Sequence, residues 1–396
     1  MTRTALAALA AAALLPALPG AQDKPTKPTV DVYGFAMVDY IQDFRRIDPT
    51  WDSTLRPTRV PTVSGTFGSD GQAIFSARQS RLGVKGTFPG GPQDLRAKIE
   101  FDFYGRGTDR PDAAGQATIR LRRAYGEWGP ILGGLTDSLF MDDDYWPNII
   151  DYWGPSGMVF YRNVQIRYSP RFGGPQSIAI ALERPGSDLQ AYPEDLPDLV
   201  SDNKLPDLTA RYRVTQKWGY VQLSGILRRL GYDSAGTPNN EPKGDVTGWG
   251  LNASSTIRVL PDRLNLLVAV AGGAGISNYM NDATPDLAAG GSAADPKPEA
   301  VKLIGISAYA DVTWHPLLTS SFGYSTVRLD NTSLQPAAAF KTGQYASGNV
   351  LVHPTSDILF GPELLWGQRK DKSGASGDDV RLQISFKYAF SSGPRS

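Results

Sequence analysis

The chain of 396 residues contains no cysteine, carries no net charge and has only two histidines. The absence of cysteine excludes disulfides and thiolate metal sites. Its 40 basic and 40 acidic residues are scattered rather than gathered in blocks, which argues against a nucleic-acid-binding surface. No linker or shift in composition divides the chain, although its length would allow two domains.

Long hydrophobic runs are also missing beyond the amino terminus. A membrane-spanning helix needs roughly 18 consecutive apolar residues. The longest later candidate, residues 264–271, is interrupted by Asn265 and followed directly by glycines. If the protein lies in a membrane, it must therefore cross as strands.

The amino terminus has the pattern of a secretory signal peptide, with a short basic start and an Ala/Leu core over residues 5–15. Pro16 and Pro19 break the core, and the bond after Ala21 is a plausible cleavage point. A buried globular helix is the alternative. We predict a signal peptide (1–21), a short periplasmic leader (22–29), a transmembrane β-barrel (30–390) and a short periplasmic tail (391–396).

The last strand-like run, residues 380–390, alternates between apolar and polar side chains. One face carries Leu382, Ile384, Phe386, Tyr388 and Phe390, and the other carries Arg381, Gln383, Ser385 and Lys387. In a water-soluble barrel the apolar face would point inward. In an outer-membrane barrel the polarity is inverted. The export signal favours the second arrangement.

Similar alternating runs, separated by Gly/Pro/Asp/Asn-rich breaks, recur along the chain. The predicted strands are 33–41, 77–84, 95–103, 119–128, 131–137, 161–168, 177–183, 208–214, 220–227, 247–257, 264–271, 303–314, 320–329, 344–352, 358–367 and 380–390. Short connections alternate with long ones such as 45–72, 185–205 and 277–298. This order is typical of outer-membrane barrels. We therefore predict an all-β protein, a closed transmembrane antiparallel β-barrel of about sixteen strands. Its turns should be short on the periplasmic side and its loops long on the extracellular side.

In many predicted strands, basic residues occupy the alternate positions whose side chains form the polar face. We expect the pore to be lined by Arg81, Lys85, Arg96, Lys98, Arg120, Arg122, Arg167, Arg211, Arg213 and Arg381. On the lipid face each such charge would cost about 2–4 kcal/mol at mid-membrane. Arg78 and Arg123 break the parity, and the pattern does not place them. As an alternative, the lumenal arginines pair with Glu100 and Asp102 and only stiffen the barrel.

Three consecutive carboxylates, Asp142, Asp143 and Asp144, open the long connection after the fifth strand. We expect this loop to fold into the lumen, face the basic wall and form a constriction, since opposed charges set selectivity in polar pores. An exposed loop that binds divalent ions or lipopolysaccharide is the alternative. The sequence predicts no catalytic residue, metal site or cofactor.

Three motifs carry a resemblance to a known family. They are LRRAYGEWG at 121–129, GGLTDSLFMD at 133–142 and WGPSG at 153–157, and QSRLG at 79–83 also fits. The chain resembles the DcaP-like trimeric outer-membrane porins. That resemblance implies a sixteen-stranded homotrimer that passes small anionic solutes, dicarboxylates among them, by passive diffusion.

The sequence thus favours an anion-preferring porin of the bacterial outer membrane, in contact with lipid and lipopolysaccharide. A non-selective porin, whose charges neutralise one another, is the alternative. The rival from another class is a barrel lipase or protease. Only His315 and His353 could serve as its usual general base, and both precede proline in predicted periplasmic turns. We therefore do not expect an enzyme.

Overall fold

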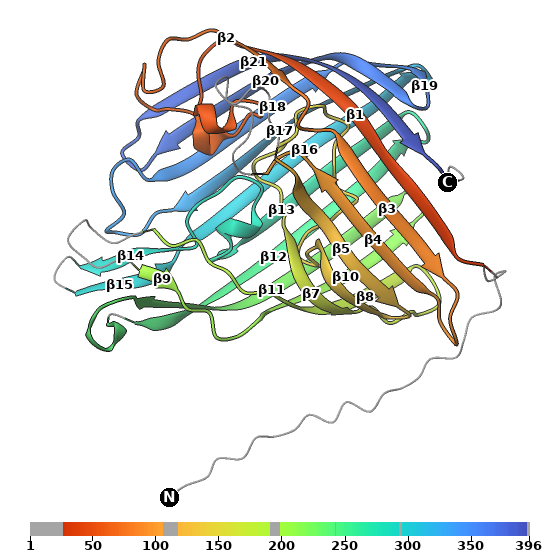
Figure 1. Cartoon of the computed structure of the whole chain (residues 1–396). Helices are drawn as coiled ribbons and strands as arrows, with labels where there is room; N and C mark the ends of the chain where they lie inside the picture. The colour runs from red at the N-terminus through yellow and green to blue at the C-terminus, as the bar shows by residue number, and fades with distance from the viewer. Residues whose placement is uncertain (1–26, 106–117, 191–198, 242, 293–294, 394–396) are drawn as a thin grey trace, which may run out of the picture.

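The computed structural model describes residues 27–105, 118–190, 199–241, 243–292 and 295–393 (Figure 1). The predicted signal peptide (1–21), residues 22–26 of the predicted leader and residues 394–396 of the predicted tail lie outside these residues. Among the described residues, none of the helices is long and apolar enough to cross a membrane. Nearly all regular structure is β-strand, in one large antiparallel sheet and one two-stranded sheet.

The strands of the large sheet are β1 (Thr29–Asp43), β2 (Gln72–Ser76), β3 (Arg81–Phe88), β4 (Leu95–Asp102), β5 (Arg120–Trp128), β6 (Ile131–Asp137), β7 (Arg162–Tyr168), β8 (Gln176–Glu183), β9 (Leu199–Ser201), β10 (Asp207–Gln216), β11 (Gly219–Ser234), β12 (Gly244–Leu260), β13 (Leu264–Ala274), β16 (Lys302–His315), β17 (Leu318–Asp330), β18 (Phe340–Asn349), β19 (Leu351–Thr355), β20 (Ile358–Asp371) and β21 (Ser376–Ser391). The remaining elements are β14 (Leu287–Ser292), β15 (Asp295–Ala300) and the 3₁₀ helices η1 (Pro49–Trp51), η2 (Pro57–Arg59), η4 (Pro238–Asn240) and η5 (Ser277–Tyr279).

The large sheet is a closed barrel of sixteen strands, as the sequence predicts. Three of these strands consist of two consecutive segments along one neighbour: β2 with β3, β9 with β10, and β18 with β19. The first and last strands, β1 and β21, pair from Tyr33 opposite Ser391 to Asp43 opposite Arg381 and so close the sheet. Closure matters because lipid offers no partners to a free strand edge.

The close approach at the barrel seam explains one glycine. Gly34 lies opposite Phe390. A Cβ added to Gly34 would lie 2.2 Å from the carbonyl oxygen of Arg81 and 2.9 Å from the Phe390 ring. Only glycine therefore allows β1 to lie this close to its neighbours.

The closing strand confirms the inverted polarity. On β21 the side chains of Ile384 and Phe386 are 45% and 47% exposed, whereas Gln383 and Ser385 are 0% and 1% exposed. Large apolar side chains are exposed in the same way on other strands, for example Ile180 on β8. Soluble proteins rarely expose contiguous apolar areas above a few hundred Å². The outer surface is therefore suited to hydrocarbon, and the polar side chains face the interior.

Short turns gather at one end of the barrel, for example residues 129–130, 316–317 and 356–357. Long connections leave the other end, for example 44–71 and 138–161. Three predicted loops contain strands that the sequence pattern did not reveal: β2, β9 and the β14–β15 hairpin. The segments β2 and β9 extend the pairing of barrel strands beyond the predicted spans.

Two local irregularities explain the arginines that break parity. The pairing of β4 with β5 shifts register so that Glu100 lies opposite Arg123 but Phe101 lies opposite Leu121. This β-bulge turns both Arg122 and Arg123 toward the interior. Arg78 lies in the break between β2 and β3, where its guanidinium lies 4.4 Å from the Tyr104 ring centroid.

A charge on the outer surface should weaken the barrel in a way that depends on depth. We expect Ile384→Arg, in the middle of β21, to lower the free energy of unfolding by about 2–4 kcal/mol. The control Leu317→Arg lies in an exposed turn at the end of the barrel and should cost at most about 1 kcal/mol. Urea unfolding in lipid vesicles measures both, and equal costs would contradict a lipid-facing Ile384.

Candidate functional site

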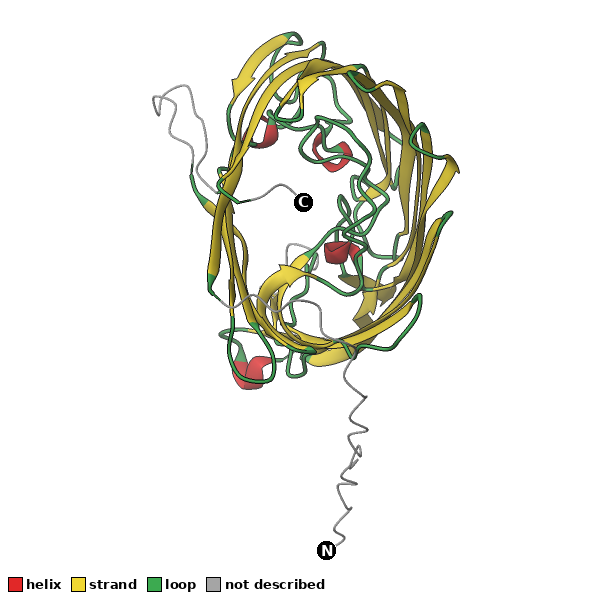
Figure 2. Ribbon diagram, turned by 90° about the vertical axis from the view of Figure 1, so that its right-hand side faces the viewer, coloured by secondary structure: helices red, strands yellow, loops and turns green. Residues whose placement is uncertain are grey.

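Several loops lie within the ring of strands (Figure 2). One of them is the connection between β6 and β7, residues 138–161, and we term it the inner loop. Its backbone N–H groups at Ile150 and Asp151 each donate to the carboxylate of Glu363 on β20, at 3.0 Å. Its Tyr145 hydroxyl donates to Ser307 on β16, at 2.7 Å. Both strands lie across the barrel from β6, so the inner loop spans and narrows the lumen.

A second connection, residues 44–71, also packs inside the barrel, and we term it the first loop. The backbone N–H of Leu55 donates to the carboxylate of Asp151 in the inner loop, at 3.2 Å. The hydroxyl of Tyr345 on β18 donates to the same carboxylate, at 3.1 Å. Burial raises the pKa of Asp151, and these hydrogen bonds oppose that rise. The two loops and the wall are thus held together through one carboxylate.

Two buried carboxylates on β4, Glu100 and Asp102, organise the basic residues beside them. The basic groups within 4.0 Å of one of them belong to Arg81, Lys98, Arg120, Arg122 and Arg123. Arg123 also contacts Asp137 on β6, at 2.5 Å. Four residues of the predicted lining are therefore gathered in one network, and pairing with Glu100 and Asp102 is part of their role.

Arginines from this network also line a cavity of about 390 Å³, which we term the inner cavity. Its lining residues are Arg56, Arg120, Leu121, Arg122, Leu135, Tyr152, Trp153, Phe160, Tyr161, Arg162, Ser277, Asn278, Met280, Asn281 and Ala283. Among the residues that the structure describes, four guanidinium groups and four aromatic rings thus meet there, and no carboxylate belongs to the lining. Such a surface can hold an anion with an apolar body.

The pattern of the sequence did not single out Arg56 or Arg162. Arg162 is the first residue of β7, on the same parity as the outward-facing Val164 and Ile166, so alternation alone would place it toward lipid. Its guanidinium instead lies 5.1 Å from the Phe160 ring centroid, and its Nη1 is buried without a hydrogen-bond partner in the described parts of the chain. The sequence feature that could have indicated this position of Arg162 is the pair of aromatic residues directly before it, Phe160 and Tyr161. Arg56 lies in the first loop, where no periodicity applies.

Three other residues of the predicted lining lie in different surroundings. Lys85 and Arg96 are about half exposed and pair with Asp31 and Glu127, at 3.3 and 3.7 Å. Arg381 has no exposed surface, because it pairs with Asp43 and Asp379 and donates to backbone carbonyls of the first loop. Its charge is satisfied within the protein rather than offered to water.

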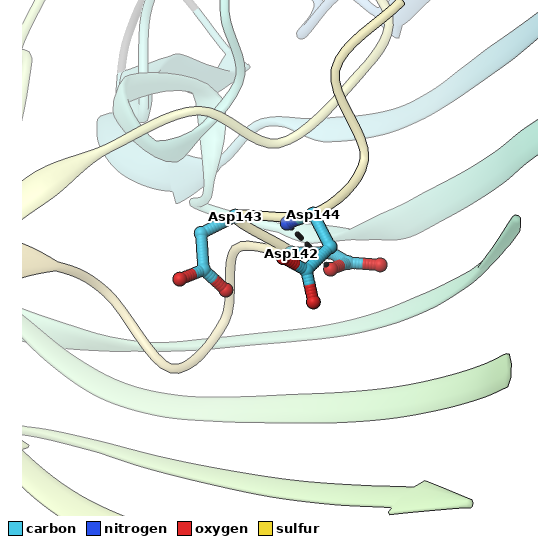
Figure 3. A group of neighbouring side chains, drawn as sticks. All are labelled: Asp142, Asp143 and Asp144. Atoms are coloured by element: carbon cyan, nitrogen blue, oxygen red, sulfur yellow. Dashed lines mark hydrogen bonds between the residues drawn. The ribbon is translucent and has the colours of Figure 1, made fainter. Parts of the chain in front are cut away.

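The three consecutive aspartates lie at the start of the inner loop, against β10 to β12 (Figure 3). Asp142 is buried and accepts hydrogen bonds from Tyr220 and Ser254, at 2.8 and 2.6 Å. Arg213 contacts Asp142 and Asp144, at 3.6 and 2.6 Å. Asp142 and Asp144 therefore contact the basic wall directly.

These carboxylates are also the described group with the spacing of metal ligands, since one oxygen of each lies within 4.8 Å of the others. Arg213 already supplies the counter-charge there. The side chain of Asp143 is exposed, but partial desolvation together with the nearby charges of Asp137 and Asp144 raises the pKa of Asp143. Arg167 donates to Gln165 and to the Asp137 carbonyl, and Arg211 has a buried Nε that finds no hydrogen-bond partner among the residues described. A selectivity role for this group stays a prediction.

Comparison with known proteins identifies the family. The model of the DcaP outer membrane protein family matches residues 21–280. The chain belongs to this family. It is therefore an outer-membrane porin, as its resemblance implies, and it lies in the outer membrane. No curated protein sequence matches the chain.

Solved structures share the fold. The outer membrane channel DcaP of Acinetobacter baumannii is 22% identical, with a TM-score of 0.79 over 93% of this chain and 99% of that one. The anion-selective porin from Comamonas acidovorans is 10% identical, with a TM-score of 0.59 over 92% and 100%. OmpT of Vibrio cholerae in its trimer form is 12% identical, with a TM-score of 0.52 over 92% and 100%.

The anchoring of the inner loop can be tested at Glu363. We expect Glu363→Gln to leave one of the two N–H donors of the inner loop poorly paired, at a cost of about 2–3 kcal/mol. The loop should then move from the wall more often, and single-channel conductance should rise or fluctuate. The control Glu127→Gln, at a partly exposed pair, should leave the conductance unchanged. A steady wild-type conductance in Glu363→Gln would contradict this anchoring role.

Proposed function

We propose that this outer-membrane porin prefers small anions, with dicarboxylates among its solutes. The observation that carries the proposal is the inner cavity, whose described lining includes four guanidinium groups and no carboxylate. An anion entering it meets Arg162, which has a buried nitrogen without a hydrogen-bond partner among the described residues. A cation would meet the same groups without any exposed counter-charge.

The balance of charge around the cavity supports this preference. Seven basic residues lie in or beside it: Arg56, Arg81, Lys98, Arg120, Arg122, Arg123 and Arg162. Four carboxylates of the described residues face them: Glu100, Asp102, Asp137 and Asp282. The network therefore keeps three positive charges in excess. At the start of the inner loop, by contrast, the charges are balanced, because three arginines lie near three aspartates. These residues are Arg167, Arg211, Arg213, Asp142, Asp143 and Asp144.

The electrostatic free energies at the cavity are large enough to produce a preference for anions. A carboxylate about 4 Å from one guanidinium gains on the order of 4 kcal/mol at an effective dielectric constant of 20. Desolvation removes part of this gain, but about 1.4 kcal/mol already gives tenfold discrimination. A dicarboxylate can place each of its charges near a different guanidinium, so it should gain more than a monocarboxylate of similar size.

The alternatives find less support. A non-selective porin would require the charges around the inner cavity to cancel, and there the basic residues outnumber the carboxylates. A barrel lipase or protease would require a general base. His315 lies at a short turn and accepts from the N–H of Leu317, and His353 lies 2.9 Å from Thr319 near the same end. Neither lies beside the inner cavity. We therefore propose a channel without enzymatic activity.

We also propose that the functional unit is a homotrimer in contact with lipid and lipopolysaccharide. The trimer form of OmpT, which shares the fold, supports the assembly. The exposed apolar side chains around the barrel support the lipid contact. Native mass measurement of the detergent-extracted protein should give three times the subunit mass, and a monomer alone would contradict the trimer.

Liposome swelling tests the solute preference. Dicarboxylates should enter faster than neutral sugars of similar size, and amines should enter most slowly. Arg162→Gln should lower the dicarboxylate rate several-fold, since it removes the unsatisfied cation. The control Arg171→Gln, in an exposed turn, should change nothing. Equal entry of amines and dicarboxylates would contradict the proposed preference.

A further inference from the structure

A second cavity, of about 540 Å³, lies beside the inner one among the long connections, and we term it the outer cavity. Its polar lining includes Arg59, Arg369, Asp188 and Gln190. The two cavities have two lining residues in common, Arg56 and Ala283. Of these, Arg56 is the one that carries a charge. The boundary between the cavities thus contains one guanidinium group.

Aromatic rings from two loops hold this guanidinium. Its Cζ lies 3.9 Å from the Trp153 ring centroid and 4.7 Å from that of Trp51. The two rings meet edge to face at 5.1 Å. Trp51 belongs to the first loop and Trp153 to the inner loop, so Arg56 joins both through cation–π contacts.

A third loop supplies the counter-charge. Arg56 Nε donates to the Oδ1 of Asp282, at 2.9 Å, and its Nη2 lies 2.9 Å from the same oxygen. The backbone N–H and the hydroxyl of Thr58 donate to Asp282 as well, at 2.8 and 2.6 Å. Asp282 has no exposed side-chain surface, whereas the side chain of Arg56 is 14% exposed. A solute at the boundary therefore meets the cation and not the carboxylate.

Arg56 also retains donor capacity. Its Nε and Nη2 face Asp282, while Nη1 has no hydrogen-bond partner within the described part of the chain. Guanidinium groups bind carboxylates and phosphates through such forked donors. Conduction through a polar pore needs several weak sites rather than one tight site. Arg56 has the position and the donors for an intermediate site.

We propose that Arg56 is a selectivity residue at the boundary between the two cavities. An anion leaving the outer cavity contacts Arg56 before it reaches Arg162, Arg120 and Arg122 in the inner cavity. This inference rests on the proposed anion preference and adds the first loop, with the fixed Arg56–Asp282 pair, to the parts of the chain that determine it.

Reversal potentials in planar bilayers under a KCl gradient test this role. Arg56→Gln should lower the anion-to-cation permeability ratio at least about threefold, because the boundary loses its cation. The double variant Arg56→Gln with Asp282→Asn removes both charges and should keep the lowered ratio, which excludes an effect of the uncovered carboxylate alone. The control Arg45→Gln lies in the same loop, paired with Asp70 and about half exposed, and should match the wild type.

The outcomes separate the two proposals. Unchanged circular dichroism and thermal unfolding establish that each variant keeps its barrel. An anion-selective wild type whose ratio survives in both Arg56 variants overturns the role of Arg56 alone. A wild type without anion preference overturns the proposed function, and with it the role of Arg56. Loss of the ratio in both Arg56 variants, with Arg45→Gln unchanged, supports both.

Discussion

The inability of lipid to form hydrogen bonds is the constraint on which this structure depends. It requires every strand edge to be paired, and the pairing of β1 with β21 completes the ring. It also requires apolar side chains on the outer face, so the polar parity of each strand turns inward. Charged side chains then crowd an interior that the loops partly fill. The lumenal carboxylates and the inward-folded loops follow from that crowding.

The ion pairs inside the lumen carry a desolvation cost, and they do not neutralise all of the positive charge. Buried ion pairs gain little net free energy, since desolvation offsets much of their attraction. Glu100 and Asp102 nevertheless reduce the mutual repulsion of the five basic groups that surround them. What they leave is an excess of positive charge beside the inner cavity. Among the described residues, Arg162 at the start of β7 has a buried Nη1 without a hydrogen-bond partner, and it lies at this cavity.

The sequence was sufficient for the barrel, because alternation is a local property. All sixteen predicted strands correspond to strands of the barrel, and the predicted polarity of β21 is confirmed. The alternation pattern did not predict side-chain direction or strand boundaries where pairing with a neighbouring strand determines them. The bulge opposite Glu100 determines where Arg123 points, and the predicted strand 344–352 is divided into β18 and β19, which both pair with β17.

The site was less predictable than the fold, since loops bring its parts together. Arg56, Trp153 and Asp282 come from three connections and meet only in the folded barrel. No spacing in the sequence relates them. The contact between Arg213 and Asp144 was foreseeable as opposite charges, but its closeness depends on how the inner loop packs.

The most direct test of the account is the reversal potential of the wild-type channel in a planar bilayer that separates two KCl concentrations. If guanidinium groups in excess line the pathway, chloride should carry most of the current, and the potential should have the sign of an anion-selective pore. A potential of the opposite sign, with Arg120, Arg122 and Arg162 intact, would contradict the account.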